Sequence, residues 1–405
     1  MDEVEAKKAV RFFGLSRNVV FLGAVSFLND FASDMVFPFI PIFLTSVLGA
    51  GVVFVGLVEG VADATASLLK VVSGRLSDKL RVRKPIIVFG YSLSAFAKPI
   101  LALAAAPWHV FVVRFLDRVG KGARDAPRDA LLSVSISKQN VGRAFGFHRG
   151  ADALGATLGP LLAFIILPWL DNNLRSLFLL SFVASFFAVL VLQFFVREVR
   201  KEKVLPPEEI APQSERFHLW SLGFPFLTFL VVSTIFALAQ ASEAFLLLRA
   251  RDFGLALALL PIIYFVANIT FTIFSTPVGI LSDKIGHRNT FMIGMLLFSG
   301  TYFFFARASS LAAVWIIFAF FGLYKAFTEG VGRAIVADLV EEKLRATAYG
   351  FYNAFVGFAA LPASLVFGFL WDRFGPAVPF YFGATFGIAA FLLFFVLRLK
   401  YLQRT

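Results

Sequence analysis

The sequence predicts an all-α integral membrane protein of twelve transmembrane helices, arranged as two parallel six-helix halves. Hydrophobic residues make up 59% of the 405 residues and charged residues only 16%, whereas a water-soluble domain of this size needs a larger polar surface. Apolar stretches of about 20 residues, the length that crosses a ~30 Å hydrocarbon layer, recur along the chain. A short charged motif also occurs twice, about half the chain apart, which indicates an internal repeat.

Twelve apolar segments follow one another, separated by charge clusters and turn residues. In the first half we expect helices at residues 18–47, 51–73, 85–105, 108–131, 140–168 and 174–197. In the second half we expect them at residues 218–249, 256–281, 290–308, 311–338, 344–371 and 376–398. Each segment is long enough to cross a bilayer as one helix.

The polar segments divide the chain into five parts. Residues 1–17 form a charged lead-in without a small-residue cleavage signature, so we expect it to stay on the cytoplasmic side. Residues 18–197 and 218–398 are the two six-helix halves. A charged, proline-containing linker joins them at 198–217, and a short cytoplasmic tail follows at 399–405.

The distribution of lysine and arginine predicts the side of the membrane that each loop occupies. Alternate loops are rich in these residues and are assigned to the cytoplasm with both termini: Arg75, Lys79, Arg81, Arg83, Lys84, Lys138, Arg143, Lys284, Arg288, Lys343 and Arg345. The opposite loops hold fewer: Arg175, Arg249, Arg251, Arg307 and Arg373. We therefore expect a multi-pass protein of the cell membrane, and we ascribe the net charge of +12 to this topology and not to nucleic-acid binding.

The repeated motif reads GRLSDKLRVRK at residues 74–84 and GILSDKIGHRN at residues 279–289, 205 positions later. RAFGF at 143–147 is echoed by TAYGF at 347–351, at nearly the same offset. A near-constant offset predicts two halves of the same orientation, because an even number of crossings restores the direction of the chain. Parallel halves of this kind pack around a central cavity and give alternating access.

These motifs resemble the signature G-x-x-x-D-[RK]-x-G-[RK]-[RK] of the major facilitator superfamily, which lies in the loops after helices 2 and 8. The second copy keeps the second glycine as Gly286, whereas the first copy has Arg81 there. The resemblance implies that the loops lock one access state, with each aspartate accepting hydrogen bonds from a neighbouring helix N-terminus. The implied gate residues are Gly74, Asp78, Lys79, Gly279, Asp283, Lys284 and Arg288. A solvated loop that only sets topology is the alternative.

Two stretches early in the chain are similar to the drug:proton antiporter branch of that family. Pro38-Phe-Ile-Pro41 resembles its P-x-x-P motif. RFLDRVGKG, which begins at Arg114, resembles R-F-L-Q-G-x-G-x-G, with Asp117 in place of Gln and Arg118 in place of Gly. We take Arg114 as the arginine of this motif because its depth in the membrane favours it, and a register that gives this role to Arg118 is the alternative.

A third stretch, Gly155-Ala-Thr-Leu-Gly159-Pro160, resembles the antiporter motif G-x-x-x-G-P. The resemblance implies a hinge at these three residues, because the glycines leave a smooth helix face and the proline can bend the helix. Close packing of the two glycines against a neighbouring helix is the alternative.

Several ionisable residues lie inside the expected helices, where each costs at least ~2.5–3.5 kcal/mol at the membrane centre. Asp30 and Asp34 lie one turn apart, and the next helix carries Glu59 and Asp63 at the same spacing. A carboxylate in a partly dry cavity can load and release a proton when a nearby arginine moves. We expect proton coupling through Asp34, with Arg114 as its partner, and then through Asp30 and Asp63. A static buried salt bridge is the alternative.

The second half carries fewer such charges, since Asn268 stands where the repeat has Asp63. This asymmetry suggests that the first half carries proton coupling while the second half shapes substrate contacts. His148 could relay protons, and we expect Arg124 and Arg128 to form ion pairs at the wet end of their helix. The expected cavity residues are Glu59, Asp117, Arg118, Arg149, Asp152, Glu243, Asn268, Lys325, Tyr352 and Asn353.

The function that these observations favour is a secondary active transporter working by alternating access, with proton-coupled export of a small organic compound. An importer or uniporter of a small metabolite and a lipid or amphiphile translocase are the alternatives. The sequence holds no nucleophile–base pattern, phosphate-binding glycine loop or metal-ligand cluster, so we expect no enzymatic activity, no cofactor and no metal. The expected partners are the substrate, protons and the lipid bilayer, and we expect a monomer.

Overall fold

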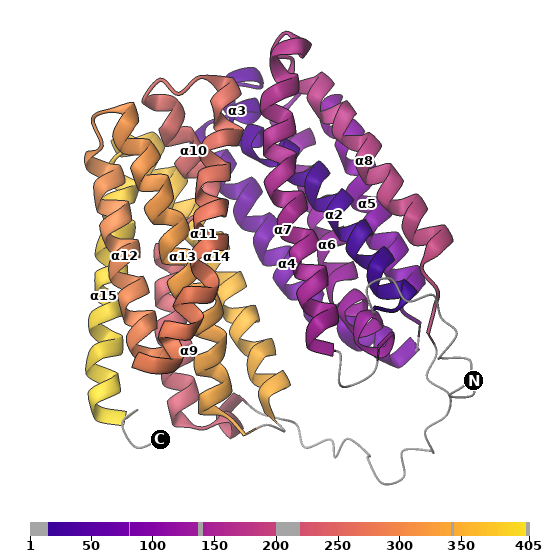
Figure 1. Ribbon diagram of the computed structural model, residues 1–405. Helices are drawn as coiled ribbons and strands as arrows, with labels where there is room; N and C mark the ends of the chain where they lie inside the picture. The colour runs from indigo at the N-terminus through magenta and orange to yellow at the C-terminus, as the bar shows by residue number, and fades with distance from the viewer. Residues whose placement is uncertain (1–14, 81, 137–140, 200–218, 342–343, 402–405) are drawn as a thin grey trace, which may run out of the picture. The chain divides into compact units, whose positions relative to one another are not determined.

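The computed structural model describes residues 15–80, 82–136, 141–199, 219–341 and 344–401, which form helices joined by short turns (Figure 1). Most of the expected lead-in and linker, and the last four residues of the tail, lie outside these ranges. The same holds for three residues assigned above to cytoplasmic loops, Arg81, Lys138 and Lys343.

The first half contains six helical segments in the expected order. The opening segment changes its helical type twice, running through α2 (Arg17–Val36), a 3-10 turn η1 (Phe37–Phe39), α3 (Ile40–Ile42) and a π-helical turn η2 (Phe43–Val47). The remaining segments are α4 (Val52–Leu80), α5 (Lys84–Ala102), α6 (Pro107–Val134), α7 (Val141–Ile166) followed by η4 (Leu167–Leu170), and α8 (Leu174–Phe195).

The second half also contains six segments, two of which open with a short 3-10 turn. These are η5 (Leu219–Leu222) with α9 (Phe224–Ala239) and α10 (Glu243–Asp252), η6 (Leu257–Leu259) with α11 (Leu260–Ile285), α12 (His287–Arg307), α13 (Leu311–Leu339), α14 (Arg345–Phe374) and α15 (Val378–Tyr401). The expected order of segments is confirmed.

Local sequence explains where many of these helices begin. Ser16, Asn173 and Ser310 each accept a hydrogen bond from a backbone N–H in the first turn of the following helix, which satisfies a donor that has no intrahelical partner. Helix α6 instead begins with Pro107. Proline suits this position because its missing N–H would have no partner there.

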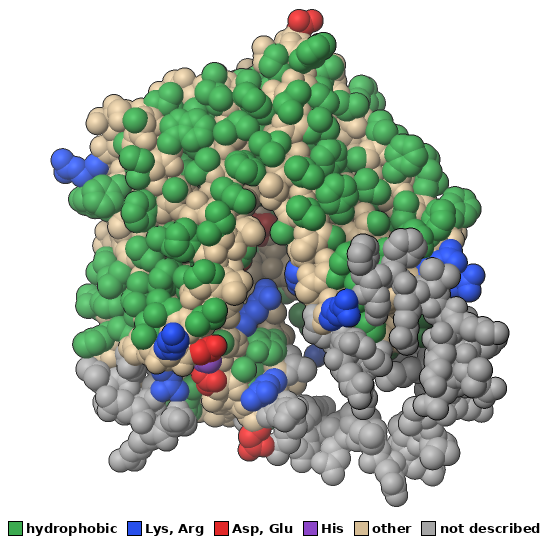
Figure 2. Space-filling view, in the orientation of Figure 1, with side chains coloured by type: hydrophobic (Ala, Val, Ile, Leu, Met, Phe, Trp, Pro, Cys, Tyr) green, Lys and Arg blue, Asp and Glu red, His purple; other side chains and the backbone are tan. Residues whose placement is uncertain are grey.

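Eleven helical segments within the described residues are long and apolar enough to cross a membrane. Helix α6 is long enough, at 28 residues, but it is not among them, because charged residues recur along it from Arg114 to Asp129. On the face shown in Figure 2, hydrophobic side chains cover the length of the helices, and Lys and Arg side chains gather toward their lower ends. The predicted all-α membrane fold is therefore confirmed.

Two local expectations are wrong. The repeated charged motif is helical and not a loop over most of its length, since α4 continues to Leu80 and α11 to Ile285. The expected helix at 218–249 is broken into α9 and α10, and Ser242 caps the second piece by accepting from the N–H of Ala244 at 3.3 Å. No glycine or proline marks this break in the sequence.

The chain folds into two compact units that do not coincide with the two sequence halves. The first comprises Met1–Phe39 and Leu68–Pro206, and the second comprises Ile40–Ser67 and Pro207–Thr405. The first part of α4 thus packs within the second unit. The division at residues 198–217 stays a prediction about the sequence repeat.

Close backbone contacts between helices hold the first unit together. Helix α2 packs along α7, where a Cβ on Gly155 would overlap the carbonyl oxygen of Phe27 and one on Gly159 that of Phe31. Helix α5 packs along α6 with Gly90 against Gly120. Absence of a side chain at these positions lets two helices approach until their backbones touch.

The second unit has an aromatic core and a glycine-lined crossing. Phe298 and Tyr302 of α12 lie 4.1 Å apart between ring centroids and are fully buried. The first part of α4 crosses α14 at Gly56 and Gly60, where a Cβ would overlap the backbone of α14. Asp372 at the end of α14 accepts from the N–H groups of Val52 and Val53, which begin α4.

Candidate functional site

Helix α6 carries a charged stripe that places most of the candidate site. Its charged residues recur every three or four positions, which puts them along one face of the helix. Apolar residues such as Val110 and Val113 are buried at the start of the helix. The stripe comprises Arg114, Asp117, Arg118, Lys121, Arg124, Asp125 and Arg128.

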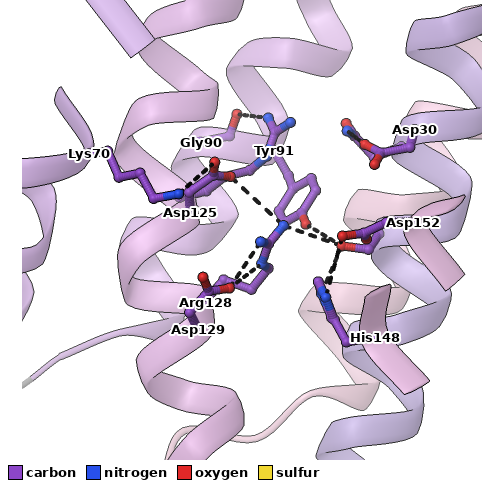
Figure 3. A network of polar contacts seen from close by, with 12 residues as sticks. Asp30, Lys70, Gly90, Tyr91, Asp125, Arg128, Asp129, His148 and Asp152 are labelled. Carbon is purple, nitrogen blue, oxygen red and sulfur yellow. Dashed lines mark hydrogen bonds and ion pairs between the residues drawn. The ribbon is translucent and has the colours of Figure 1, made fainter. Parts of the chain in front are cut away.

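Arg128 lies at the centre of a polar network (Figure 3). Its Nη2 and Nε donate to Asp129 Oδ1 at 2.9 and 3.1 Å, and its Nη1 lies 3.8 Å from Asp125 Oδ1. Lys70 of α4 lies 3.9 Å from the other oxygen of Asp125. Arg128 is only 7% exposed. The expected ion pairs are therefore confirmed for Arg128 and not for Arg124, which forms none among the described residues. The expected wet position is wrong for both, because both guanidinium groups are buried.

Ser26 of α2 connects this network to α5 and α7. Its Oγ lies 2.9 Å from His148 Nε2 and 3.2 Å from the hydroxyl of Tyr91, and it accepts from Arg128 Nη1 at 3.4 Å. His148 Nδ1 in turn lies 3.5 Å from Asp152 Oδ2. His148 is 1% exposed, so it is an interior residue of the bundle and part of a continuous polar chain.

Asp152 and Asp30 bring two carboxylates into the same region. Asp152 Oδ2 pairs with His148 and, at 3.6 Å, with Arg149 Nη1, while its buried Oδ1 has no hydrogen-bond partner among the described residues. Asp30 accepts from Asn29 Nδ2 at 3.1 Å, and it lies in the same region as Asp152 (Figure 3). The fold thus brings together two predicted site residues from different helices. Asp30 was expected to carry protons, and Asp152 was expected to line the substrate cavity.

Asp117 lies among four cations on the other part of the stripe. Arg114 Nη1 lies 3.6 Å and Arg118 Nε 4.0 Å from its Oδ2. Lys98 of α5 and Arg124 are the other two positive charges that act on it. Arg114 also lies over the ring of Phe37, 5.6 Å from its centroid, which places it beside the end of α2.

The remaining predicted carboxylates of the first half occupy different units. Asp34 is half-buried in α2 in the first unit, whereas Glu59 is buried and Asp63 half-buried in the part of α4 that belongs to the second unit. Each of the three is engaged by neighbouring groups. Of the four predicted proton-coupling residues, Asp30, Asp34 and Arg114 therefore lie in the first unit and Asp63 lies in the second.

Glu243 and Lys325 form the main ion pair of the second unit. Lys325 Nζ lies 2.6 Å from Glu243 Oε1 and 3.5 Å from Glu329 Oε1. The ammonium group also lies 5.7 Å from the ring centroid of Phe271 and 5.8 Å from that of Phe321, a geometry that stabilises a cation. The break before α10 places Glu243 in the first turn of a new helix.

The other predicted cavity residues of the second unit are not part of this pair. Tyr352 of α14 stacks on Phe229 with ring centroids 6.0 Å apart and packs against Gly332. Asn268 of α11 and Asn353 of α14 are half-buried. Among the described residues, no group of three or more His, Asp or Glu side chains is arranged to hold a metal ion.

The two copies of the expected gate motif have different surroundings. Gly74 and the exposed Lys79 lie in the last turns of α4, and the side chain of Asp78 lies outside what the structure describes. In the second copy, Gly279 and Lys284 lie in α11, and Arg288 is half-buried in α12.

Asp283 of the second copy contacts a histidine, and its hydrogen bond to a helix N-terminus stays a prediction. His287 Nε2 lies 3.4 Å from Asp283 Oδ1, and its Nδ1 lies 2.6 Å from Asp338 Oδ2 at the end of α13. His287 belongs to the repeated motif itself, but nothing in the sequence indicated Asp338 as its partner.

The residues that the sequence analysis missed are those whose importance depends on helix packing. Ser26 and Tyr91 are ordinary residues of apolar helices, and no pattern in the sequence distinguishes them. Lys98 could have been selected as a lone cation in the interior of an apolar helix, because a buried charge is costly.

The chain matches the Major Facilitator Superfamily over residues 22–268 and 226–404. It is 36% identical over 385 residues to an uncharacterized MFS-type transporter of Methanocaldococcus jannaschii, with 94% of each chain covered. It is 27% identical over 314 residues to the multi-drug resistance efflux pump PmrA of Streptococcus pneumoniae, covering 74% of this chain and 75% of that one.

A crystal structure of a POT family transporter in complex with 5-aminolevulinic acid shares the fold. Its TM-score is 0.79 at 14% identity, covering 98% of this chain and 99% of that one. These proteins are transporters and not enzymes. The chain belongs to the Major Facilitator Superfamily, and its function is membrane transport.

Proposed function

We propose that the protein is a proton-coupled exporter of a small organic compound that works by alternating access. The observation that carries this proposal is the buried polar chain of the first unit, in which Asp30 and Asp152 lie near each other and Asp152 Oδ1 has no donor among the described residues. Buried ionisable groups of this kind in membrane helices are a mark of proton relays.

The chemistry requires one proton and a change of neighbours. Two nearby carboxylates repel each other, and a proton bound to one of them removes the repulsion. Arg128 and His148 link these carboxylates to α6 and α2 through Ser26. Rearrangement of the helices would alter these links, so the site can take up a proton in one access state and release it in the other.

Asp34, Asp63 and Arg114 remain proposed members of the coupling site. Arg114 supports this because it lies beside Phe37 at the end of α2, the helix that carries Asp34. Glu243 and Lys325 are the proposed substrate contacts of the second unit, together with Tyr352. Export is favoured over import by the 27% identity to a multi-drug resistance efflux pump.

The gate and the setting are part of the same proposal. One access state would be closed by the gate residues Gly74, Asp78 and Lys79 and their counterparts in α11. The hinge would be formed by Gly155, Gly159 and Pro160 of α7. The protein would lie in the cell membrane as a monomer with both termini in the cytoplasm, in accord with the distribution of lysine and arginine.

The test is proton release from purified protein in detergent when amphiphilic compounds are added in weakly buffered solution. We expect at least one compound to release protons from the wild type, and we expect Asp30→Asn and Asp34→Asn to reduce that release. Asp171→Asn is the matched control, because Asp171 is an exposed turn residue with φ of 52°, a conformation that asparagine also adopts.

Two outcomes would contradict the proposal. Binding of a compound without proton release would favour a uniporter. Proton release that both variants retain would place coupling outside α2. In vesicles, an exporter must in addition move the compound against its gradient when a proton gradient is imposed, and equal movement without the gradient would exclude coupling.

A further inference from the structure

We infer that the transported compound carries an anionic group, a carboxylate, phosphate or sulfonate, which binds at two buried cations of the first unit, Lys98 of α5 and Arg124 of α6. This inference rests on the proposed transport function and adds the charge of the substrate. The sequence does not determine that charge, because acidic and basic residues are mixed along the helices.

The two cations converge on one residue, Ser94. Lys98 Nζ donates to the backbone oxygen of Ser94 at 3.3 Å, and Arg124 Nη1 donates to Ser94 Oγ at 2.6 Å. Ser94 Oγ itself donates to the backbone oxygen of Asp117 at 3.2 Å. The backbone contact of Gly90 with Gly120 holds this part of α5 against α6. Helix packing therefore fixes the positions of both positive charges.

Neither cation has a carboxylate partner within the part of the chain that the structure describes. Lys98 is 6% and Arg124 4% exposed, and neither forms an ion pair with any of the described residues. The Arg124 guanidinium lies 4.4 Å from the ring centroid of Tyr91, and its Nε is buried without a hydrogen-bond acceptor. Buried charges are normally paired, because removal from water is costly when no opposite charge replaces the lost hydration.

The surrounding charges do not neutralise the pair. Five cations lie on this part of α5 and α6: Lys98, Arg114, Arg118, Lys121 and Arg124. Even when Asp30, Asp34 and Asp125 are counted with Asp117, four carboxylates stand against these five cations, which leaves an excess of one positive charge.

The neighbouring network around Arg128 is balanced by contrast. It contains the cations Lys70 and Arg128 and the carboxylates Asp125, Asp129 and Asp152 (Figure 3). Arg149 is a third cation, paired with Asp152. Each cation of the Arg128 network therefore has a carboxylate within ion-pair distance, whereas Lys98 and Arg124 have none among the described residues.

An anionic group would supply the missing negative charge. The guanidinium fork matches the geometry of a carboxylate or phosphate, and a lysine beside it adds a compact positive charge. Approach along α6 is available, since Lys121 is exposed and the side chains of Arg118 and Asp117 are 14% and 20% exposed. A cationic compound would add to the excess charge and is disfavoured there.

The first experiment compares small aromatic probes that differ mainly in charge. Benzoate, phenylphosphonate and benzenesulfonate are the anions, benzyl alcohol is neutral and benzylammonium is the cation. Each is added to purified wild-type protein in detergent at constant ionic strength, and the melting temperature is measured, because a ligand of the folded state raises it. We expect at least one anion to raise it by several degrees and the neutral and cationic probes to leave it unchanged. Benzoate and phenylphosphonate separate carboxylate from phosphate recognition.

Variants then assign the effect to the site. We expect Lys98→Gln and Arg124→Gln each to weaken the affinity for the stabilising anion at least tenfold, and Lys98→Arg to retain most of it. Asp117→Asn should tighten anion binding, because it removes the carboxylate that competes with the ligand. Arg307→Gln is the control, since it removes one exposed positive charge at the end of α12.

A merely structural role for the two cations predicts different results. In that case Lys98→Gln would lower the melting temperature without ligand, whereas removal of an unpaired buried charge should leave it unchanged or raise it. Stabilisation by all probes alike, or an anion response that survives in Lys98→Gln and Arg124→Gln, would overturn the inference. If both variants fail to fold, Lys98→Arg and Asp117→Asn still test it through the change in anion affinity.

Together with the proton-release assay, the binding measurements test the anionic substrate and the proton coupling independently. Anion binding at Lys98 and Arg124 without proton release would uphold the substrate class and contradict proton coupling. Proton release by cationic compounds alone would uphold coupling and contradict the anionic substrate.

Discussion

At the scale of single residues, the glycines of α7 fall into two groups. Gly155 and Gly159 touch the backbone of α2, whereas Gly146 and Gly150 have nothing within 4 Å of the position that a Cβ would occupy. Both pairs have the same four-residue spacing, and only the pair Gly155 and Gly159 is followed by a proline. The close approach of α2 and α7 therefore depends on the first group, which gives the predicted hinge motif a packing function whether or not it also bends.

Gly159→Val should destabilise the protein by about 1–3 kcal/mol, because its side chain would overlap the carbonyl oxygen of Phe31. Gly150→Ala, in the same helix, should be neutral or stabilising, since alanine favours a helix more than glycine does. Unfolding of the purified protein by sodium dodecyl sulfate measures both changes. Equal effects of the two substitutions would contradict the close contact.

Ser26 shows how a residue without any sequence signal can organise a site. Ser26→Ala should lower the free energy of unfolding by ~1–3 kcal/mol, because His148, Tyr91 and Arg128 all lose a buried partner. Ser185→Ala is the matched control, since Ser185 is also buried in the first unit but its hydroxyl has no partner among the described residues. If both substitutions cost the same, the Ser26 network contributes no stability.

At the scale of elements, α6 is amphipathic in a manner that fits a protein interior and not a lipid surface. Its charged face meets α5 through Arg124 and α2 through Arg128, and Ser26 of α2 continues the contact to α7. Arg128 is paired with carboxylates there, whereas Arg124 has no ion pair among the described residues. Helix α6 faces other helices along its charged side, and this explains why it lacks the apolar composition of the other spans although it is long enough to cross a membrane.

Asp372 is the clearest link between elements that are far apart in the sequence. Its carboxylate oxygens lie 3.1 Å from the N of Val52 and 2.9 Å from the N of Val53, so the end of α14 caps the start of α4. Asp372→Ala should lower the free energy of unfolding by ~0.5–2 kcal/mol, as loss of an N-cap does. Arg373 is the exposed neighbour, and Arg373→Gln should change the free energy of unfolding little. Chemical unfolding of both variants measures the difference.

At the scale of the whole molecule, residues 40–67 pack with the second unit although they belong to the first half of the sequence. The crossing of α4 with α14 uses Gly56 and Gly60, and it ends at the Asp372 cap. If alternating access separates the two sequence halves, this crossing must open in one state.

A disulfide between cysteines at positions 51 and 372 tests that requirement. A Cβ on Gly51 would lie 3.9 Å from Cγ of Asp372, so the two side chains meet, and the natural chain has no cysteine to interfere. We expect the oxidised Gly51→Cys, Asp372→Cys protein to lose transport and to regain it with dithiothreitol. Neither single variant should respond to oxidation. Full transport by the cross-linked protein would show that the crossing stays closed throughout the cycle.

The sequence predicted the architecture well because hydrophobic stretches are local. Several segments agree within about two residues, as for 311–338 against Leu311–Leu339 and 174–197 against Leu174–Phe195. The break between α9 and α10 was missed because Gln240 and Ser242 are not strong helix breakers. The charged motif was taken as a loop because its charges end the apolar run, although a helix can continue beyond the membrane.

By itself, the sequence determined the membrane class, the order of twelve helical segments, the repeat and the family, since each follows from composition, spacing or motif along one stretch of chain. Only the tertiary structure decided which charges are neutralised. Asp129 pairs with Arg128, whereas Lys98 and Arg124 converge on Ser94 without an ion pair among the described residues. The reason is physical: an ion pair depends on the rotation and separation of helices from distant segments, and small glycine contacts such as Gly90 with Gly120 set both.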